Sequence, residues 1–259
     1  FNPWTRGVRA DQGGPRAWNH GGWSGAEWVE PAEVPFTVKV LGTDAGSWLA
    51  LHQQLAKAFA PSSVDVELRF TLGGREYVMF GRPRGINPSP IRLGVGEVFT
   101  DCRFGAPDPN IYSGQLHSTD PIPLPTQVGG LTVPFAAPFS VPGMVIGGRV
   151  DLLNEGTTEA GLVVRIDGPV TEPRLTLQRP DGAIQSVTWH GLTIPAGQFL
   201  IVDTAARQAF LNGDQASAAH PGHADWPLLQ AEATSVLRFN AAEHDDGKLV
   251  AQWRDAWWS

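Results

Sequence analysis

The sequence is poor in charged side chains and has no long apolar run. Charged residues make up 17% of the 259 positions, below the ~25% typical of soluble domains, whereas the hydrophobic fraction of 42% is ordinary. So few charges are typical of a protein whose faces become covered. No apolar run reaches the ~18 residues of a membrane-spanning helix, and no signal-peptide pattern is present. The sequence therefore predicts a soluble, unexported chain without a membrane partner.

Cysteine is nearly absent. Cys102 is the only one, which excludes an intrachain disulfide and a zinc site built from several thiolates. It stands in a strand-like run close to Phe104, where a free cysteine is usually a buried, unreactive thiol.

Basic residues are outnumbered. There are 19 Lys and Arg against 26 Asp and Glu, a net charge of -7, which argues against a nucleic-acid partner because phosphates require a basic surface. Residues 1–126 hold 11 basic and 12 acidic residues, and residues 127–259 hold 8 and 14. A nearly neutral first half and an acidic second half predict two units with different surroundings.

Turn-forming residues are abundant. The 30 Gly and 22 Pro favour many short strands over long helices. Prolines are densest from Pro107 to Pro142, which forbids a regular central strand or helix over most of that span. We therefore predict an N-terminal domain of residues 1–126, a Pro-rich linker of residues 127–142 and a C-terminal domain of residues 143–259.

One segment of the first half has the periodicity of a helix. Apolar residues recur at spacings of three to four from Trp48 to Phe59. Asp44 or Ser47 is placed to cap the start, and Pro61 ends the segment.

Elsewhere in the first half, alternation of apolar and polar residues predicts strands. The Gly73-Gly74 pair predicts a hairpin between two of them. The predicted strands cover residues 36–40, 64–70 and 76–80, with a further pair between 93 and 104.

The second half has eight short predicted strands. Asp181-Gly182, Asn212-Gly213 and Asp246-Gly247 lie between them, and such dipeptides are selected by tight turns. Turn signals at this close spacing predict an antiparallel β-sandwich. The strands are Gly148–Leu153, Leu162–Asp167, Arg174–Gln178, Ala183–Trp189, Gln198–Asp203, Gln208–Leu211, Ser235–Phe239 and Lys248–Trp253.

Several motifs occur in the order known from one family. Phe104 followed by Asp108–Ser113 (DPNIYS) resembles the "F…DPxxYS" segment that closes the N-terminal domain in distal tail proteins of actinobacterial siphoviruses and their prophages. Asn19–Trp23 resembles the early HG-plus-aromatic loop of that family, and Tyr77–Arg84 resembles its "GRPR" strand end. Matching segments of the second half are Asn154–Thr157, Ile166–Pro169, Gly197–Asp203, Leu211–Gly213 and Trp253–Trp257. The N-terminal strand usual in the family is absent or shortened, and residues 121–142 match nothing in its pattern.

This resemblance implies a mainly β fold, with an N-terminal split β-barrel (belt) domain that has one helix, followed by a C-terminal galectin-like antiparallel β-sandwich. It also implies a homo-oligomeric ring of six copies in the virion tail tip, assembled in the host cytoplasm. The implied partners are the major tail tube protein, the tail hub or tail-associated lysin protein, and receptor-binding proteins carried by the sandwich. A ring of identical subunits requires heterologous contacts that close, which suits the weakly charged first half.

No catalytic constellation is evident. The sequence has no G-x-S-x-G elbow, H-E-x-x-H, P-loop, or G-x-G-x-x-G after a strand. The carboxylates Asp65/Glu67 and Asp151/Glu155 could imitate a glycosidase pair, but the sequence does not fix their separation. We predict a protein that is not an enzyme and has no cofactor.

Two loops contain potential metal ligands. His220, His223 and Asp225 are close together, but two histidines across a Pro-Gly turn lack an obvious third ligand and supporting shell, so a solvated loop is the preferred interpretation. Asp245-Asp246-Gly247 lacks the alternating carboxylates and distant Glu of a calcium loop, which favours a hairpin turn.

The ten tryptophans are the strongest candidates for binding. Trp48, Trp189 and Trp253 lie on predicted elements and are expected in the cores. The others singled out lie in loops or at the chain end: Trp23, Trp28, Trp226, Trp257 and Trp258. Exposed indoles can stack on sugars, which leaves a carbohydrate-binding module at the host surface as the alternative. Because aromatic residues are enriched at protein interfaces, we prefer an interface role.

Arg82 and Arg84 flank Pro83 and pose a similar choice. A guanidinium suits an inter-subunit carboxylate or an aromatic ring, although two arginines here could also be a solvated strand exit. The family position favours the interface. Asp108-Pro109 is most simply a turn, since the residue before proline is pushed out of the helical region.

Overall fold

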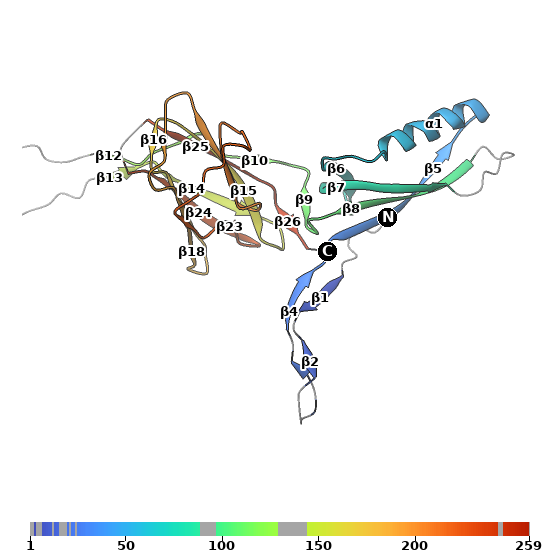
Figure 1. The fold of residues 1–259 in the computed structure, drawn as a ribbon, viewed down its shortest axis with the longest axis horizontal. Helices are drawn as coiled ribbons and strands as arrows, with labels where there is room; N and C mark the ends of the chain where they lie inside the picture. Colours follow the sequence, from blue (N-terminus) through green and yellow to red (C-terminus); the bar gives the residue numbers. More distant parts are fainter. Residues whose placement is uncertain are drawn as a thin grey trace, which may run out of the picture. The chain divides into compact units, whose positions relative to one another are not determined.

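The computed structural model describes residues 3, 7–11, 13–15, 20, 22–23, 25–88, 97–128, 144–242 and 246–258. The chain divides into two compact units, Phe1–Gly114 with Trp257–Ser259, and Gln115–Ala256. Over the described ranges the fold is mainly β with one helix (Figure 1), which confirms the predicted fold class.

The first unit is built on one antiparallel sheet with the strand order β26-β9-β7-β8-β5, and β6 pairs with β7 outside this path. The strands are β5 (Ala32–Leu41), β6 (Val66–Leu72), β7 (Arg75–Pro88), β8 (Glu97–Ala106), β9 (Ile111–Ser113) and β26 (Ala256–Trp257). Gly73 and Gly74 form the predicted turn between β6 and β7, and both adopt positive φ (58° and 79°).

Alternate residues of these strands form a compact core. Val34, Met79 and Ile111 are completely buried, and Phe104 is 2% exposed. Each comes from a different strand, so packing of these side chains joins β5, β7, β8 and β9 into one unit.

The helix α1 (Ala45–Ala58) follows β5, as predicted. Asp44 is its N-cap, and its side chain accepts a hydrogen bond from the Ser47 backbone N–H at 2.8 Å. The Ser47 hydroxyl accepts in return from the Asp44 N–H at 3.1 Å, which completes a capping box. At the other end, the Phe59 ring packs on Phe36 of β5, with 5.8 Å between ring centroids.

The N-terminal segment forms two short antiparallel ribbons. β1 (Val8–Asp11) pairs with β4 (Ala26–Val29), and β2 (Gly14–Pro15) pairs with β3 (Gly22–Trp23). Each is a two-stranded sheet separate from the main sheet.

The second unit contains two antiparallel sheets. One has the order β10-β25-β15-β20-β21, with β11 paired to β25 and β23 paired to β15, and the other has the order β14-β24-β17-β18-β22. The first comprises β10 (His117–Ser118), β11 (Ile122–Pro123), β15 (Ala160–Asp167), β20 (Phe199–Asp203), β21 (Gln208–Leu211), β23 (Leu228–Leu229) and β25 (Lys248–Trp253). The second comprises β14 (Arg149–Asn154), β17 (Arg174–Gln178), β18 (Ile184–Thr188), β22 (His223–Ala224) and β24 (Ala233–Asn240).

All eight predicted strands of this half are present, and both sheets contribute buried apolar residues to the core. Leu162 and Ile166 of β15 and Leu175 and Leu237 of the other sheet are at most 1% exposed. Such alternating burial is the pattern of a β-sandwich. Two further two-stranded pairs are β12 (Thr126–Val128) with β13 (Met144–Ile146), and β16 (Val170–Thr171) with β19 (Thr193–Ile194).

The tight-turn dipeptides act in different ways. Gly182 (φ 88°) turns β17 into β18, and Asn212 and Gly213 (φ 55° and 70°) turn the chain after β21. Gly247 is needed for space instead, because a Cβ there would lie 2.0 Å from Val170 Cγ2.

The division between the units falls earlier in the sequence than the predicted linker. Residues 115–126, which we placed in the first domain, belong to the second unit because β10 and β11 pair with β25. Of the predicted linker 127–142, only residues 127 and 128 lie within the described ranges, where they are part of β12.

Candidate interface sites

Arg82 is paired within its own unit. Its Nε donates to Asp65 Oδ1 at 2.7 Å, and the two side chains are 41% and 45% exposed. An exposed pair of this kind contributes about 0–1 kcal/mol. Arg82 therefore has a carboxylate partner without a neighbouring subunit, and its inter-subunit role stays a prediction.

Arg84 is placed by a β-bulge. In the pairing of β7 with β8, Pro83 faces Phe104 and Gly85 faces Arg103, so Arg84 is the extra residue on β7. A bulge redirects its side chain, and here the side chain lies over Gly105, where an added Cβ would be 2.5 Å from Arg84 Nε. Among the described residues, no carboxylate forms an ion pair with Arg84.

Arg84 borders a surface hollow, which we call the Arg84 hollow. Its volume is about 410 Å³, and its lining comes from the start of β5 and the ends of β7 and β8. The lining residues are Pro31, Ala32, Glu33, Arg84, Gly105, Ala106 and Pro107. Ala32 and Ala106 are almost fully buried, whereas Glu33 is exposed and lies 3.6 Å from Nη1 of Arg103. The lining thus combines small and proline residues with one carboxylate, Glu33, and one guanidinium, Arg84.

The predicted tryptophans of the N-terminal segment lie on the ribbons. Trp28 is in β4, directly opposite Arg9 of β1, and is 58% exposed. Trp23 is in β3 opposite Gly14, but its side chain lies outside the part of the chain that can be described.

The C-terminal tryptophans differ from one another. Trp257 of β26 is half-buried, with its ring edge-on to Tyr77 at 5.5 Å between centroids, and Tyr77 stacks on Phe70 at 5.7 Å. It is thus part of the packing of the first unit. Trp258 is 44% exposed.

In the second unit, Trp226 lies between β22 and β23 and is half-buried. Of the predicted core residues, Trp189 is buried at 1% exposure, and Trp48 is half-buried and stacks on His52 at 5.3 Å. Trp253 is also half-buried, and its Nε1 donates to the Leu153 carbonyl at 2.8 Å.

The DPNIYS motif is a structural turn. Asp108 Oδ1 accepts a hydrogen bond from the Asn110 N–H at 2.9 Å, and the Tyr112 hydroxyl donates to Asp108 Oδ2. Ile111 and Ser113 point into the core at 0% and 9% exposure. The motif closes the sheet of the first unit through β9, so its carboxylate supports the fold.

The potential metal-binding loop is exposed, and three of the potential catalytic carboxylates lie beside arginines. His223 belongs to β22 and faces Thr188 of β18, and over the described ranges no group of three His, Cys, Asp or Glu residues is arranged to hold a metal ion. Among the carboxylates that could imitate a glycosidase pair, Asp65, Glu67 and Asp151 lie beside arginines.

Cys102 is buried in β8 at 1% exposure, as predicted. Burial, and secondarily the charge of Asp101, raises the pKa of its thiol. A raised pKa lowers the thiolate fraction and hence the reactivity of the thiol.

Sequence reasoning missed a partly buried polar cluster in the second unit. His117 Nε2 lies 3.0 Å from Asp255 Oδ2, and Asp255 Oδ1 accepts from the Glu155 N–H at 3.1 Å. The His117 ring also stacks on Trp253 at 5.1 Å between centroids. His117 and Asp255 are 138 residues apart, so no local pattern could have connected them.

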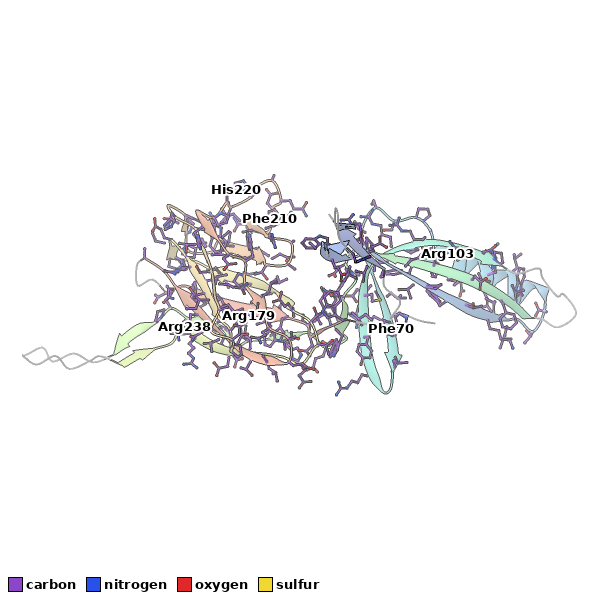
Figure 2. All side chains as sticks on the ribbon, turned by 90° about the horizontal axis from the view of Figure 1, so that it is seen from below. Phe70, Arg103, Arg179, Phe210, His220 and Arg238 are labelled. Atoms are coloured by element: carbon purple, nitrogen blue, oxygen red, sulfur yellow. The ribbon has the colours of Figure 1, made fainter. Side chains whose placement is uncertain are left out.

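The side-chain view of the molecule (Figure 2) has Phe70 on the β6–β7 hairpin and Arg103 on the sheet of the first unit, while Phe210, His220, Arg179 and Arg238 belong to the second unit. No helix in the described ranges has the length and apolar character to cross a membrane.

Comparison with known proteins identifies the fold. No family model matches the sequence, and no curated protein matches it. Among solved structures, the Dit protein of phage SPP1, a paradigm of the hub adsorption apparatus of phages infecting Gram-positive hosts, matches with a TM-score of 0.59 and 13% identity over 97% of this chain and 89% of that one. A chain of the phage P2 baseplate, in its activated conformation with Ca, matches with a TM-score of 0.50 and 10% identity over 96% and 89%.

These matches extend over both units. The chain therefore has the fold of a phage tail-tip structural protein, and more particularly that of a siphophage distal tail protein, as the ordered motifs predicted.

Proposed function

We propose that this chain is a distal tail protein, six copies of which form a ring at the tail tip of a siphovirus. In this role the ring joins the major tail tube protein to the tail hub or tail-associated lysin protein. The observation that carries the proposal is the match to the SPP1 Dit protein, which extends over 97% of this chain rather than over one unit. The role is structural, without catalysis or a cofactor, and the location is the virion after assembly in the host cytoplasm.

The surface of the first unit supports assembly through protein contacts. Large apolar residues are exposed on several of its elements, including Trp28 at 58%, Leu41 at 58% and Phe99 at 49%. A protein interface of standard size requires such residues at its centre and a polar rim. We expect the first unit to form the ring and the second unit to be the part that can carry receptor-binding proteins.

Mass photometry and negative-stain imaging of the purified chain test the ring. The expected result is a closed oligomer of six copies, or a monomer that joins a ring only with its tail partners. Immunogold labelling of isolated virions should then mark the tail tip. A chain that stays monomeric and is absent from virions would contradict the proposal.

A carbohydrate-binding role requires freely accessible indole faces. Of the five tryptophans considered for it, Trp226 is half-buried and Trp257 packs against Tyr77. Trp28 and Trp258 are 58% and 44% exposed. A glycan array gives an independent test. Glycan binding that is lost in Trp226→Ala and retained in Trp258→Ala would support glycan recognition by the second unit.

A further inference from the structure

Three arginines are neighbours on the outward face of one sheet of the second unit. Arg149 of β14 is directly opposite Arg238 of β24. Arg174 of β17 is the diagonal neighbour of Arg238, because it stands two residues from Thr176, which Arg238 faces. All three arginines are exposed, whereas the residues that alternate with them point into the core (Arg238 is labelled in Figure 2). We call Arg149, Arg174 and Arg238 the arginine face.

This concentration of positive charge contrasts with the rest of the second unit. Residues 115–256 contain 8 Lys and Arg against 15 Asp and Glu, a net charge of -7. The five strands β14, β24, β17, β18 and β22 nevertheless contain three arginines and a single carboxylate, Asp151. Asp151 lies 3.3 Å from Arg149, and Arg238 donates to the neutral amide of Gln178 at 3.3 Å. Arg174 forms no ion pair among the described residues, so the face keeps an excess of positive charge.

The excess charge is unfavourable for the chain by itself. Like charges directly opposite each other, as Arg149 and Arg238 are, destabilise an antiparallel pair. Glu172 is the nearest carboxylate to Arg174 along the chain, but it accepts a hydrogen bond from the Gly191 N–H at 2.8 Å. An anion from outside the chain would remove the repulsion, because a guanidinium binds a carboxylate or a phosphate through two parallel N–H groups. The arginine face is therefore complementary to a partner with several anionic groups.

Exposed aliphatic residues on the same face favour a protein over a phosphate polymer. Leu153 of β14 is 46% exposed and Ile184 of β18 is 63% exposed, and both have the outward position of the arginines in their strands. Burial of such side chains requires apolar surface on the partner, which phosphate groups do not supply. Protein interfaces combine an apolar centre with complementary charges.

We infer that this face docks another protein of the tail tip. Carboxylates of that protein pair with the arginine face, and its apolar side chains cover Leu153 and Ile184. This inference rests on the proposed function, because it states the chemistry of the protein that the second unit carries.

Charge reversal in the virion tests the docking. Virions assembled with Arg174→Glu or Arg238→Glu should contain this chain at the parent level and at least tenfold less of one other tail protein, as measured by quantitative mass spectrometry. Arg207→Glu is the matched control, since Arg207 is an exposed arginine of the same unit outside this sheet, and it should leave the composition unchanged. If charge reversal impairs folding, Arg174→Gln removes the charge without adding a carboxylate and should lower the same protein. An unchanged composition in all these variants would overturn the inference.

Zero-length cross-linking identifies the carboxylates directly. A carbodiimide joins a carboxylate to a lysine amine and does not react in this way with a guanidinium, so Arg174→Lys or Arg238→Lys places one reactive amine on the face. In treated virions this lysine should be linked to an Asp or Glu of the same tail protein that Arg174→Glu loses. Arg207→Lys should give no link to that protein.

The outcomes separate the inference from the proposed function. A chain that is absent from virions overturns both. A chain that is present at the tail tip, with no cross-link from either lysine, overturns the inference alone, and so does a cross-link only to a second copy of this chain. Immobilised inorganic polyphosphate gives the remaining arm. If the purified parent chain binds it, Arg174→Glu does not, and virions keep every tail protein, the ligand is a phosphate and the protein partner is excluded.

Discussion

Asn154 is completely buried, and its amide group makes four hydrogen bonds. Nδ2 donates to the carbonyls of Thr158 at 2.8 Å and Gln230 at 3.2 Å. Oδ1 accepts from the N–H groups of Gly156 at 3.0 Å and Ala256 at 3.3 Å. One side chain thereby bonds to the backbone of four residues.

We expect Asn154→Asp to destabilise the second unit by about 2–3 kcal/mol, because an oxygen would replace the donor that faces two carbonyls. Urea unfolding followed by tryptophan fluorescence measures the change. Asn240→Ala, at a half-buried position in the same sheet system, is the matched control and should shift the midpoint little. Equal effects of the two substitutions would contradict the assigned role.

The raised pKa of the Cys102 thiol predicts two behaviours. The thiol should resist a disulfide reagent at neutral pH in the folded chain and react once the chain is unfolded in urea. The pKa of the thiol is higher in the folded chain than in the unfolded chain. Below the unfolded value of about 8.5 the thiol is neutral in both states, so it does not change the free energy of unfolding. Above it, stability falls as pH rises through the folded pKa. Cys102→Ala should remove this component of the pH dependence, and an identical decline in both proteins would show that the thiol does not contribute.

At the scale of elements, the N-cap of α1 makes the free energy of unfolding depend on pH with a sign opposite to that of Cys102. The hydrogen bond from the Ser47 backbone N–H is the largest cause that lowers the pKa of Asp44. A lowered folded pKa gives stabilisation that is present above the unfolded value of about 3.9 and is lost as pH falls through the folded pKa.

Asn caps a helix nearly as well as Asp but does not titrate. We therefore expect Asp44→Asn to unfold with a weaker dependence on pH between about 5 and 2.5 than the parent chain. Circular dichroism of α1 during acid titration reports the difference. Parallel titration curves would count against a charged cap.

Elements were predictable where the information is local. The alternation in residues 64–70 and the Gly73-Gly74 pair are enough to specify a hairpin, and the spacing from Trp48 to Phe59 is enough for a helix. The bulge at Arg84 was not predictable, because it depends on how β8 aligns with β7. The domain limit was also not predictable, because the placement of β10 and β11 depends on β25, more than 120 residues away along the chain. Among the proposed interface residues, the sequence was enough to select Trp28 and Arg84 by the chemistry of their side chains. It could not show that Trp257 packs within its own unit.

At the scale of the whole molecule, the end of the chain belongs to the unit that contains its beginning. Trp257 joins the first unit through β26 and the Tyr77 ring. We expect Trp257→Ala to destabilise the first unit by about 1–3 kcal/mol, less than the 3–5 kcal/mol typical of a fully buried tryptophan. Trp258→Ala, one residue further on, is the control and should have a much smaller effect. Limited proteolysis with mass spectrometry separates the two units, and accelerated cleavage confined to residues 115–256 would contradict this role.

The return of β26 to the sheet of the first unit makes the second unit an insertion rather than an appended domain. The chain leaves after β9 and re-enters at β26, and these two strands are neighbours in the sheet, so the two ends of the insertion start about 5 Å apart. Closely spaced termini are the condition under which insertion of a domain is tolerated. Any module whose own termini are close together could occupy the same position without altering the order of strands in the first unit.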